Sequence, residues 1–128
     1  IQALILNYKI KDLLKLNQLR RKIASEYDKK IINKKIYKIR YSKHSVYHQY
    51  VIIIKERNKL IEYLNKSKIQ FGFHYPYAVH QLDVFKNLFK KDKFENAEIL
   101  AKYGISIPIN PLLTKKEVSY IINKLNNF

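Results

Sequence analysis

The sequence predicts an α/β domain of the α+β type, in which a small, mostly antiparallel sheet of about three to five strands carries helices on one face. Short β-branched and aromatic runs alternate along the chain with segments whose apolar residues recur every three or four positions. Only two glycines and three prolines interrupt the 128 residues, and 47% of the residues are hydrophobic. These numbers predict one folded domain with a modest core, preceded by a long helix.

The first predicted element is a single long helix over residues 1–32. No glycine or proline precedes residue 72, and the second half of the helix has one apolar face. The opening stretch IQALIL is apolar nearly all round, which predicts burial against another copy of the chain or against a preceding domain. We therefore expect two regions, a linking helix at 1–33 and a small domain at 34–128.

Strands and helices are predicted to alternate after this helix. The apolar run at 51–54 predicts a strand buried on both faces at the centre of the sheet. Gly104 predicts a left-handed residue after a helix, and Pro108 predicts an edge strand because proline donates no ladder hydrogen bond. Thr114 and Glu117 form a capping box. The expected order is an edge strand at 35–41, a strand at 45–56, a helix at 57–66, a strand at 69–73, a helical turn at 84–90, a helix at 94–103, a strand at 105–109 and a helix from about residue 115.

Charge and composition limit the possible function classes. The formal net charge of +16 invites a nucleic-acid partner, but lysines are spread over nearly every segment and no arginine-rich block occurs. Such a spread is typical of a general enrichment in lysine, isoleucine, asparagine and tyrosine, and it does not favour nucleic-acid binding. Cysteine is absent, so disulfide and thiolate chemistry are excluded. No apolar run is long enough to span a membrane, and we expect a soluble, cytoplasmic protein without a membrane partner.

Ring and hydrogen-bonding side chains gather in GFHYPYAVHQLDVF, residues 72–85, at the end of a predicted strand. Proline disfavours the helical conformation of the residue before it, so the backbone at Tyr75 is expected to be extended. Gly72 permits another group to approach the strand closely. Imidazole, phenol and amide groups at a strand end can bind an anionic or sugar-like ligand, whereas a polar loop with aromatic packing explains the same residues equally well.

Neither a metal site nor a catalytic set is predicted from the residues. His44 and His48 are four residues apart, which in a strand separates them by about 13 Å and prevents them from sharing an ion. The structural explanation for His48 is a half-buried histidine bonded to a backbone carbonyl. The sequence contains no phosphate-binding glycine loop, no serine elbow and no carboxylate pair at an active-site spacing.

Four stretches in order, covering nearly the whole chain, carry a resemblance to a known family. They are IQALILNYKIKDLLKLNQLRRKIASEYDKKI, SVYHQYVIII, IQFGFHYPYAVHQLDVF and FENAEILAKYGISIPINPLLTKKEVSYIINKL. They resemble the C-terminal part of the DegT/DnrJ/StrS family of PLP-dependent nucleotide-sugar aminotransferases. The third stretch is similar to the family's Gly-x-His-Tyr-Pro segment with a later His-Gln, and the fourth is similar to its closing Pro-x-Leu-Thr-x-x-Glu.

The resemblance implies the small C-terminal domain of the fold type I aminotransferase fold. In that family a large domain holds PLP on a lysine, and the small domain closes over the substrate. The homodimeric enzymes transfer an amino group, typically from glutamate, to a keto sugar on a nucleotide carrier. By resemblance, His74, Tyr75 and His80 line the sugar-nucleotide side of the cleft, and His48 lies near them.

The departures from the family define what the chain is expected to lack. The large domain, its cofactor-binding turn and its lysine have no counterpart here, so no catalytic residue is assigned and no PLP is expected on this chain alone. We expect a truncated and inactive aminotransferase fragment that self-associates through its first helix or receives a large domain in trans. A basic nucleic-acid-binding module and a self-associating interaction domain remain as alternatives.

Overall fold

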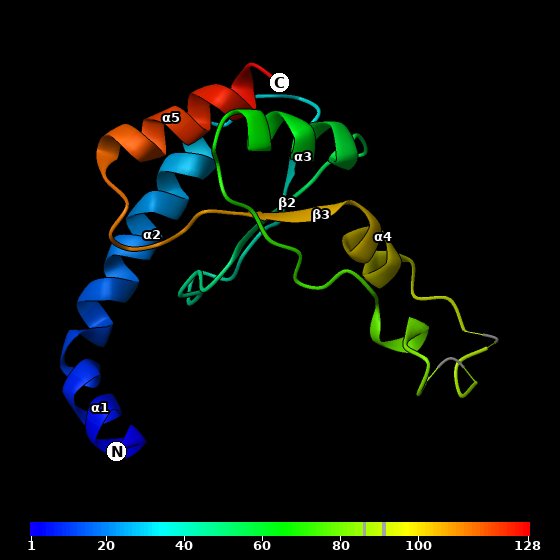
Figure 1. The fold of residues 1–128 in the computed structure, drawn as a ribbon, viewed down its shortest axis with the longest axis horizontal. Coiled ribbons are helices and arrows are strands. Elements are labelled where there is room, and N and C mark those ends of the chain that lie inside the picture. Colours follow the sequence, from blue (N-terminus) through cyan, green and yellow to red (C-terminus); the bar gives the residue numbers. More distant parts are fainter. Residues whose placement is uncertain (86, 91) are drawn as a thin grey trace. The chain divides into compact units, whose positions relative to one another are not determined.

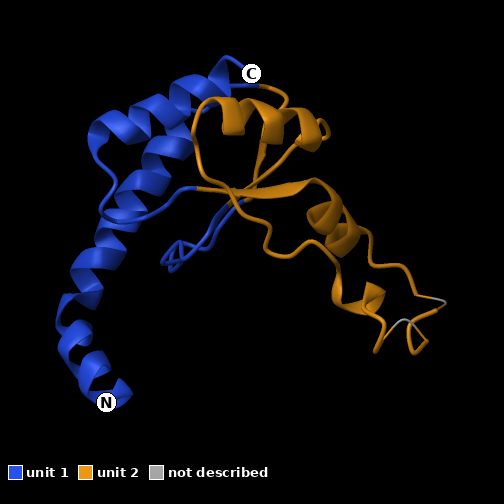
Figure 2. Ribbon diagram, viewed as in Figure 1, with its two compact units in different colours: residues 1–33, 40–50, 108–128 blue, residues 34–39, 51–107 orange. Residues whose placement is uncertain are grey.

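The computed structural model of the protein describes residues 1–85, 87–90 and 92–128 (Figure 1). These residues form two compact units (Figure 2). Unit 1 contains residues 1–33, 40–50 and 108–128, and unit 2 contains residues 34–39 and 51–107. The two ends of the chain therefore belong to the same unit, and most of the middle of the chain forms the other.

Unit 1 is built around the helix that opens the chain. α1 (Gln2–Lys9), a short 3₁₀ helix η1 (Ile10–Asp12) and α2 (Leu13–Lys30) follow one another without a break. The predicted long helix is thereby confirmed. It ends slightly earlier than predicted because the backbone of Ile31 is extended.

The apolar face of α2 packs against α5 (Lys115–Asn126), the last helix of the chain (Figure 1). The hydroxyl of Tyr27, which is buried, donates a hydrogen bond to the carbonyl oxygen of Pro108 at 2.7 Å. Burial raises the pKa of Tyr27, so the phenol stays neutral and remains a donor. The buried residues of the two helices are Ile23, Ala24 and Tyr27 in α2 and Val118, Ile121, Ile122 and Leu125 in α5.

Side-chain amides join the ends of these two helices. Asn126 Oδ1 accepts a hydrogen bond from the backbone N–H of Ile32 at 2.8 Å, and its Nδ2 donates to Lys30 O at 2.8 Å. In return, Asn33 Nδ2 donates to Leu125 O at 2.8 Å. The last two bonds satisfy the carbonyls of Lys30 and Leu125, which a helix end leaves without an intrahelical partner, and the first pairs the N–H of Ile32.

The predicted capping box starts α5, as the sequence indicates. Glu117 N–H donates to Thr114 Oγ1 at 3.3 Å, and Thr114 N–H donates to Glu117 Oε2 at 2.7 Å. The hydrogen bonds from Thr114 hold the pKa of the Glu117 carboxyl below its usual value. Two backbone donors at the helix start are thus paired by side chains, which confirms the predicted start of the helix.

The sheet has the strand order β1-β2-β3. β1 (Tyr37–Lys38) pairs antiparallel with β2 (Tyr50–Ile53), with Tyr37 opposite Ile53 and Lys38 opposite Ile52. β3 (Gly104–Ile107) is buried at all four positions. The central position predicted for the apolar run at 51–54 is confirmed, because β2 is the middle strand.

Several predicted strands are shorter than the sequence suggests, and the edge strand predicted at 35–41 is reduced to the two residues of β1. Residues 45–49 are not part of β2, because Tyr47 has a positive φ of 51°, which no strand residue adopts. The strand predicted at 69–73 is reduced to one bridge, between Gly72 and Ser106. Its first residues complete the end of the preceding helix instead, since Ile69 N–H donates to Leu64 O at 2.9 Å.

The helices of unit 2 lie where the periodicity places them. α3 (Arg57–Lys66) has the predicted bounds, and α4 (Glu95–Tyr103) begins one residue after its predicted start. The predicted helical turn at 84–90 consists of turns, and Lys86 within it lies outside the described residues. None of the helices in the described ranges has both the length and the apolar character needed to span a bilayer.

The left-handed conformation predicted for Gly104 is wrong. Its φ of −72° and ψ of 141° are those of an extended residue. Glycine is needed there because a Cβ would lie 2.4 Å from the carbonyl oxygen of Leu100 in the last turn of α4. The left-handed residue after a helix is Lys68 instead, with φ of 54° after α3.

Candidate functional site

The ring-rich segment starts where Gly72 pairs with β3. Gly72 N–H donates to Ser106 O at 3.0 Å, and Ser106 N–H donates to Gly72 O at 2.8 Å. Ser106 is buried, as are its neighbours in β3. The backbone two residues before His74 is therefore attached to the most buried strand of the sheet.

His74 folds back onto this bridge. Its Nδ1 lies 2.9 Å from Ser106 Oγ, a hydrogen bond between two side chains that are 32 positions apart. A Cβ on Gly72 would lie 2.8 Å from Cε1 of the imidazole. Glycine at this position therefore leaves the space that the ring occupies. This explains the glycine that precedes the histidine in the sequence.

Tyr75 and Tyr77 extend from this anchored position into solvent. The ring centroids of His74 and Tyr75 are 6.0 Å apart, and the peptide bond between the two residues is cis. Tyr75 is 73% exposed, and within the described residues its hydroxyl has no hydrogen-bond partner. The segment thus presents one held imidazole and one free phenol side by side, a combination that can contact the hydroxyls and the phosphates of a ligand.

Arg57 supports the same segment from the start of α3. Its Nη1 donates to Ala101 O at 2.7 Å and to Gly104 O at 3.3 Å, so it satisfies carbonyls where α4 passes into β3. Its guanidinium carbon lies 5.0 Å from the centroid of the Phe73 ring. One arginine thereby joins α3, the α4–β3 junction and the residue next to His74.

His80 lies against α4 rather than free in a loop. It belongs to the 3₁₀ helix η2 (Val79–Gln81), and its Nε2 is 3.1 Å from Glu98 Oε1. Its ring centroid lies 4.8 Å from that of Phe94, and its side chain is only 13% exposed. The histidine therefore holds η2 to α4 through an interaction that becomes an ion pair when the ring is protonated.

His48 belongs to unit 1, in the loop of residues 40–49 that precedes β2. The loop is held by Arg21, whose Nε donates to Ser45 O at 2.9 Å and whose Nη2 donates to His44 O at 3.4 Å. His48 is exposed, and no other described residue is hydrogen-bonded to its ring. The alternative of a half-buried histidine on a backbone carbonyl is therefore wrong. Among the described residues, no group of three His, Cys, Asp or Glu could hold a metal ion.

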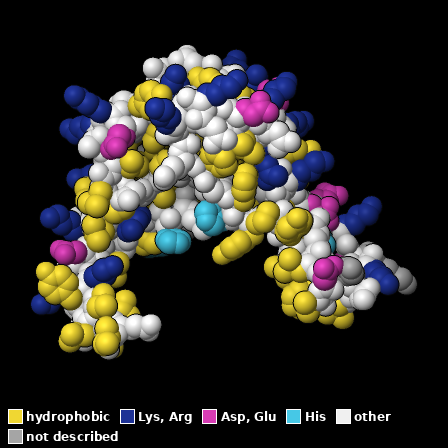
Figure 3. All heavy atoms as spheres, viewed as in Figure 1, with side chains coloured by type: hydrophobic (Ala, Val, Ile, Leu, Met, Phe, Trp, Pro, Cys, Tyr) yellow, Lys and Arg dark blue, Asp and Glu magenta, His cyan; other side chains and the backbone are white. Residues whose placement is uncertain are grey.

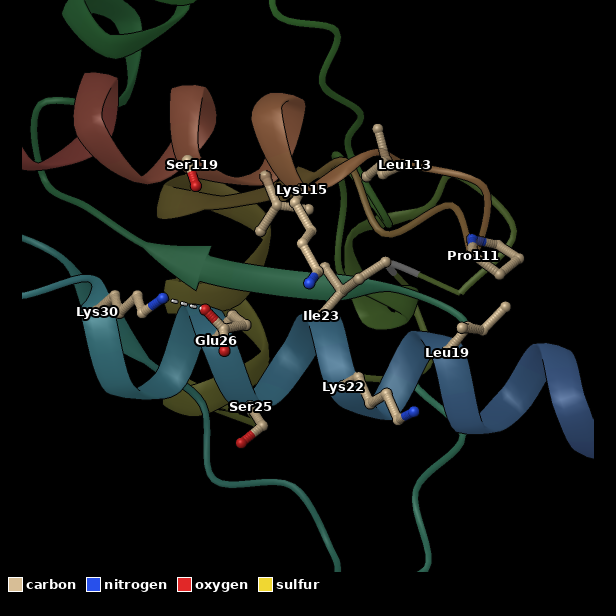
Figure 4. A pocket seen from close by; sticks show the side chains of 11 residues that line it. Leu19, Lys22, Ile23, Ser25, Glu26, Lys30, Pro111, Leu113, Lys115 and Ser119 are labelled. Atoms are coloured by element: carbon tan, nitrogen blue, oxygen red, sulfur yellow. Dashed lines mark ion pairs between the residues drawn. The ribbon is translucent and has the colours of Figure 1, made fainter.

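A pocket of about 550 Å³ lies between α2 and α5, and none of the predicted site residues lines it (Figure 4). Lys30 pairs with Glu26 at one end of the pocket and holds the pKa of that carboxyl below its usual value. Lys115 extends from α5 toward Ile23 of α2 (Figure 4). Leu19 and Ile23, which belong to the apolar face that the sequence periodicity predicts for the first helix, form part of the pocket wall. The periodicity therefore indicates where the pocket lies, but it does not indicate which ligand could bind there.

Two residues that organise the site were missed by the sequence analysis. Ser106 stands at a polar position of a short alternating strand, where a hydroxyl is expected to face water. Arg57 stands at the start of a helix, where an arginine is usually solvated. Arg57 is recognised by its hydrogen bond to the distant Ala101 carbonyl, and Ser106 by its hydrogen bond to His74. Neither pairing can be read from local sequence patterns.

A long leading helix and a three-stranded sheet define an α+β arrangement that is similar to part of solved aminotransferase structures. DesV of S. venezuelae, in complex with a ketimine intermediate, matches 98% of this chain with a TM-score of 0.88 and 23% identity. Spr1654 of Streptococcus pneumoniae, in its PLP-form, matches 94% with a TM-score of 0.76 and 24% identity. The fold is therefore that of part of a PLP-dependent aminotransferase, which confirms the predicted fold class.

The chain belongs to the DegT/DnrJ/EryC1/StrS aminotransferase family, whose model matches residues 1–126. A curated relative from Aneurinibacillus thermoaerophilus, dTDP-3-amino-3,6-dideoxy-alpha-D-galactopyranose transaminase, is 31% identical over 130 residues. That alignment covers 100% of this chain and 36% of the relative. The match to DesV likewise covers 35% of the DesV chain. The predicted family is confirmed, and the chain spans about a third of the length of these relatives.

The space that Gly72 leaves for His74 predicts a coupling between the two residues. Gly72→Ala should lower the free energy of unfolding by about 1 kcal/mol, since the added Cβ displaces the imidazole from Ser106. In the His74→Ala background the same substitution should be neutral or slightly stabilising, because Gly72 has no positive φ and alanine restricts the unfolded chain. Urea unfolding of the unaltered chain, the two single variants and the double variant measures this coupling.

Gly104→Ala is the matched control for this cycle. Its Cβ would meet the backbone oxygen of Leu100, which no side-chain substitution removes. It should therefore destabilise the protein equally in the presence and absence of His74. An equal cost of Gly72→Ala in both backgrounds would show that the glycine serves some purpose other than holding the imidazole.

Proposed function

We propose that this chain is the C-terminal, small-domain part of a PLP-dependent aminotransferase that acts on a nucleotide-linked keto sugar. In this proposal, residues 1–33 are the helix that links to a large domain, and residues 34–128 form the small domain. His74, Tyr75, His80 and His48 contact the substrate, and this part of the enzyme is inactive alone.

The observation that carries the proposal is the arrangement of Gly72, Ser106 and His74. A histidine that served only to fill a loop would need neither a glycine cleared for its ring nor a buried hydroxyl on its Nδ1. That hydrogen bond orients the ring and leaves Nε2 for a ligand atom. The exposed phenol of Tyr75 stands beside it. A side chain anchored in this way to a buried strand is suited to binding, because little entropy is lost when the ligand arrives.

The substrate class is supported by the relative from A. thermoaerophilus, whose name describes a transaminase of a dTDP-linked amino sugar. A nucleotide sugar carries a diphosphate and several hydroxyls. Imidazole and phenol groups can donate to both kinds of oxygen. The chemistry of His74 and Tyr75 therefore suits this class of substrate, and we extend the substrate class of the relative to this chain on that basis.

The cofactor of the family does not fit the residues of this part of the enzyme. Spr1654 has been solved in a PLP-form and in a PMP-form. PLP supplies an electron sink for amino transfer and is held by a desolvated lysine. Every lysine within the described residues is exposed or only half-buried. In this proposal the chain offers substrate-side groups, and the lysine that holds PLP comes from a large domain.

Nucleic-acid binding receives less support from the distribution of charge. On the face shown in Figure 3, Lys and Arg side chains are spread among hydrophobic side chains and do not form one continuous patch. A nucleic-acid site gathers its basic residues along the path of the phosphates. The net charge of +16 is therefore better explained by the general lysine content than by such a site.

We also propose that the exposed apolar start of the helix drives self-association of the isolated chain. Figure 3 shows hydrophobic side chains gathered over α1, where Leu4 is 76% exposed. Light scattering over a concentration series should show dimers or larger species, and Leu4→Ser with Leu14→Ser should shift them toward monomer. Leu88 is similarly exposed but lies outside this helix, so Leu88→Ser is the control and should leave the distribution unchanged. A monomer at every concentration would contradict this assembly.

A separate prediction concerns PLP on the isolated chain. Addition of PLP followed by borohydride reduction should label exposed lysines at many positions and below one equivalent each, because no lysine within the described residues is buried. Mass spectrometry of the peptides maps the adducts, and the urea-unfolded chain is the control and should give a similar pattern. One stoichiometric adduct, with a matching visible absorbance before reduction, would show that the chain holds the cofactor itself.

The prediction for amino transfer requires the chain together with a large domain, joined to it or supplied in trans. Amino transfer to a nucleotide-linked keto sugar should appear only in that combination. His74→Ala should raise the KM for the sugar nucleotide about tenfold or more, as expected for the loss of a hydrogen bond to a charged group, and PLP binding should not change.

His44→Ala is the matched control for His74→Ala, since His44 is an exposed histidine outside the proposed site. It should leave both the KM and PLP binding unchanged. Equal losses in the two variants, or a loss of PLP binding in His74→Ala, would remove His74 from the substrate side.

A further inference from the structure

A second concave surface lies entirely within unit 1, beside the loop of residues 40–49. It is a pocket of about 310 Å³, at the small end of the range for ligand sites. Its walls come from α2, from the loop and from the turn that follows β3. The lining residues are Leu16, Arg20, His48, Ile109, Asn110, Pro111 and Leu112. None of them is acidic, and three of them carry polar N–H groups.

Arg20 is the charged group of this pocket, and its orientation is set by its own helix. Its Nη1 donates to Asn17 Oδ1 at 3.1 Å, one turn earlier on α2. The side chain is only partly exposed. The opposite edge of the guanidinium, formed by Nε and Nη2, has no hydrogen-bond partner among the described residues. That edge is the planar fork that binds carboxylates and phosphates with two parallel hydrogen bonds.

The next residue along the helix shows what such an edge does when acceptors are available. Arg21 uses its Nε and Nη2 on two consecutive carbonyl oxygens of the loop, at 2.9 Å and 3.4 Å. The fork of Arg21 is therefore occupied by the protein, whereas the fork of Arg20 has no such acceptor among the described residues, and Arg20 lines an open pocket. Arg20 therefore lines the pocket, and the adjacent Arg21 holds the loop that forms one of its walls.

Asn110 and His48 add donors to the same pocket. Asn110 Oδ1 accepts the backbone N–H of Leu112 at 2.9 Å, so the amide NH₂ is the part of this side chain that remains for a ligand. The imidazole of His48 has no hydrogen bond to any other described residue. A neutral imidazole offers one N–H donor and a protonated one offers two.

We propose that Arg20, His48 and Asn110 form a binding site for an oxyanion, a carboxylate or a phosphate group. The three polar side chains among the lining residues all carry N–H donors, and no carboxylate lines the pocket to compete for Arg20. Leu16, Ile109 and Leu112 provide an apolar wall for the organic part of such a ligand. The site is drawn from unit 1 alone and shares only His48 with the residues proposed to contact the substrate, so its test is separate from the role of His74.

The experiment follows the arginine Nε–H signals of the ¹⁵N-labelled chain during titration with inorganic phosphate, acetate and butyrate at constant ionic strength. Saturable shifts should appear at Arg20 together with the side-chain signals of His48 and Asn110. Tighter binding of phosphate assigns the site to a phosphate group. Tighter binding of butyrate than of acetate assigns it to a carboxylate that packs on the apolar wall. Either ranking supports an oxyanion site.

Variants separate a built site from the general attraction of a cationic chain for anions. Arg20→Gln should weaken binding of the preferred anion about tenfold or more, the usual effect of losing a charge-assisted hydrogen bond. Arg20→Lys should also weaken it, because lysine keeps the charge but lacks the fork. Arg40→Gln removes the same charge from an exposed arginine outside the pocket and should have no effect.

The proposal is overturned if the shifts increase linearly without saturation, or if Arg40→Gln weakens binding as much as Arg20→Gln. The amide spectrum of each variant, compared with that of the unaltered chain, confirms that the fold is retained. Asn17→Ala provides an independent variant that leaves the charge in place. It should weaken binding less than Arg20→Gln does, because it removes only the bond that orients the guanidinium.

Discussion

The two backbone hydrogen bonds between Gly72 and Ser106 are the constraint on which the candidate site depends. They attach the loop after α3 to β3, which is the most buried strand of the sheet. Once Ser106 is fixed, its hydroxyl determines where the imidazole of His74 lies, and the ring then excludes any Cβ at Gly72. Each of these hydrogen bonds contributes only about 1 kcal/mol net, so their main effect is to select one conformation.

Unit 1 is organised by the same kind of long-range polar contact. The hydroxyl of Tyr27 reaches Pro108 O, and the hydroxyl of Tyr50 donates to Asp28 Oδ1 at 2.5 Å. The rings of the two tyrosines pack edge to face with their centroids 5.1 Å apart. Burial raises the pKa of both phenols, so both remain neutral donors at physiological pH. The apolar rings supply the area that is buried, and the hydroxyls fix which carbonyl and which carboxylate they meet.

Sequence patterns predicted the helices well because their signals are local. The capping box before α5 and the periodicity of α3 lie within a few residues of the elements that they define. The strands were predicted less well, since Tyr47 and Lys68 adopt left-handed conformations that no local pattern requires. In the site, the chemistry of His74 and Tyr75 could be inferred from their types. The partner of His74 could not, because Ser106 lies 32 positions away.

Net charge and binding chemistry have separate origins in this chain. Exposed lysines stay solvated, and salt screens them beyond about 10 Å at 0.1 M, so a charge of +16 attracts anions without choosing among them. Selection needs a donor whose direction is fixed before the ligand arrives. Ser106 fixes the ring of His74, and Asn17 fixes the guanidinium of Arg20. A neutral side chain orients the binding group in both cases. The groups that could recognise a particular anion are therefore these two held donors, whereas the many exposed lysines raise the local concentration of anions without selecting among them.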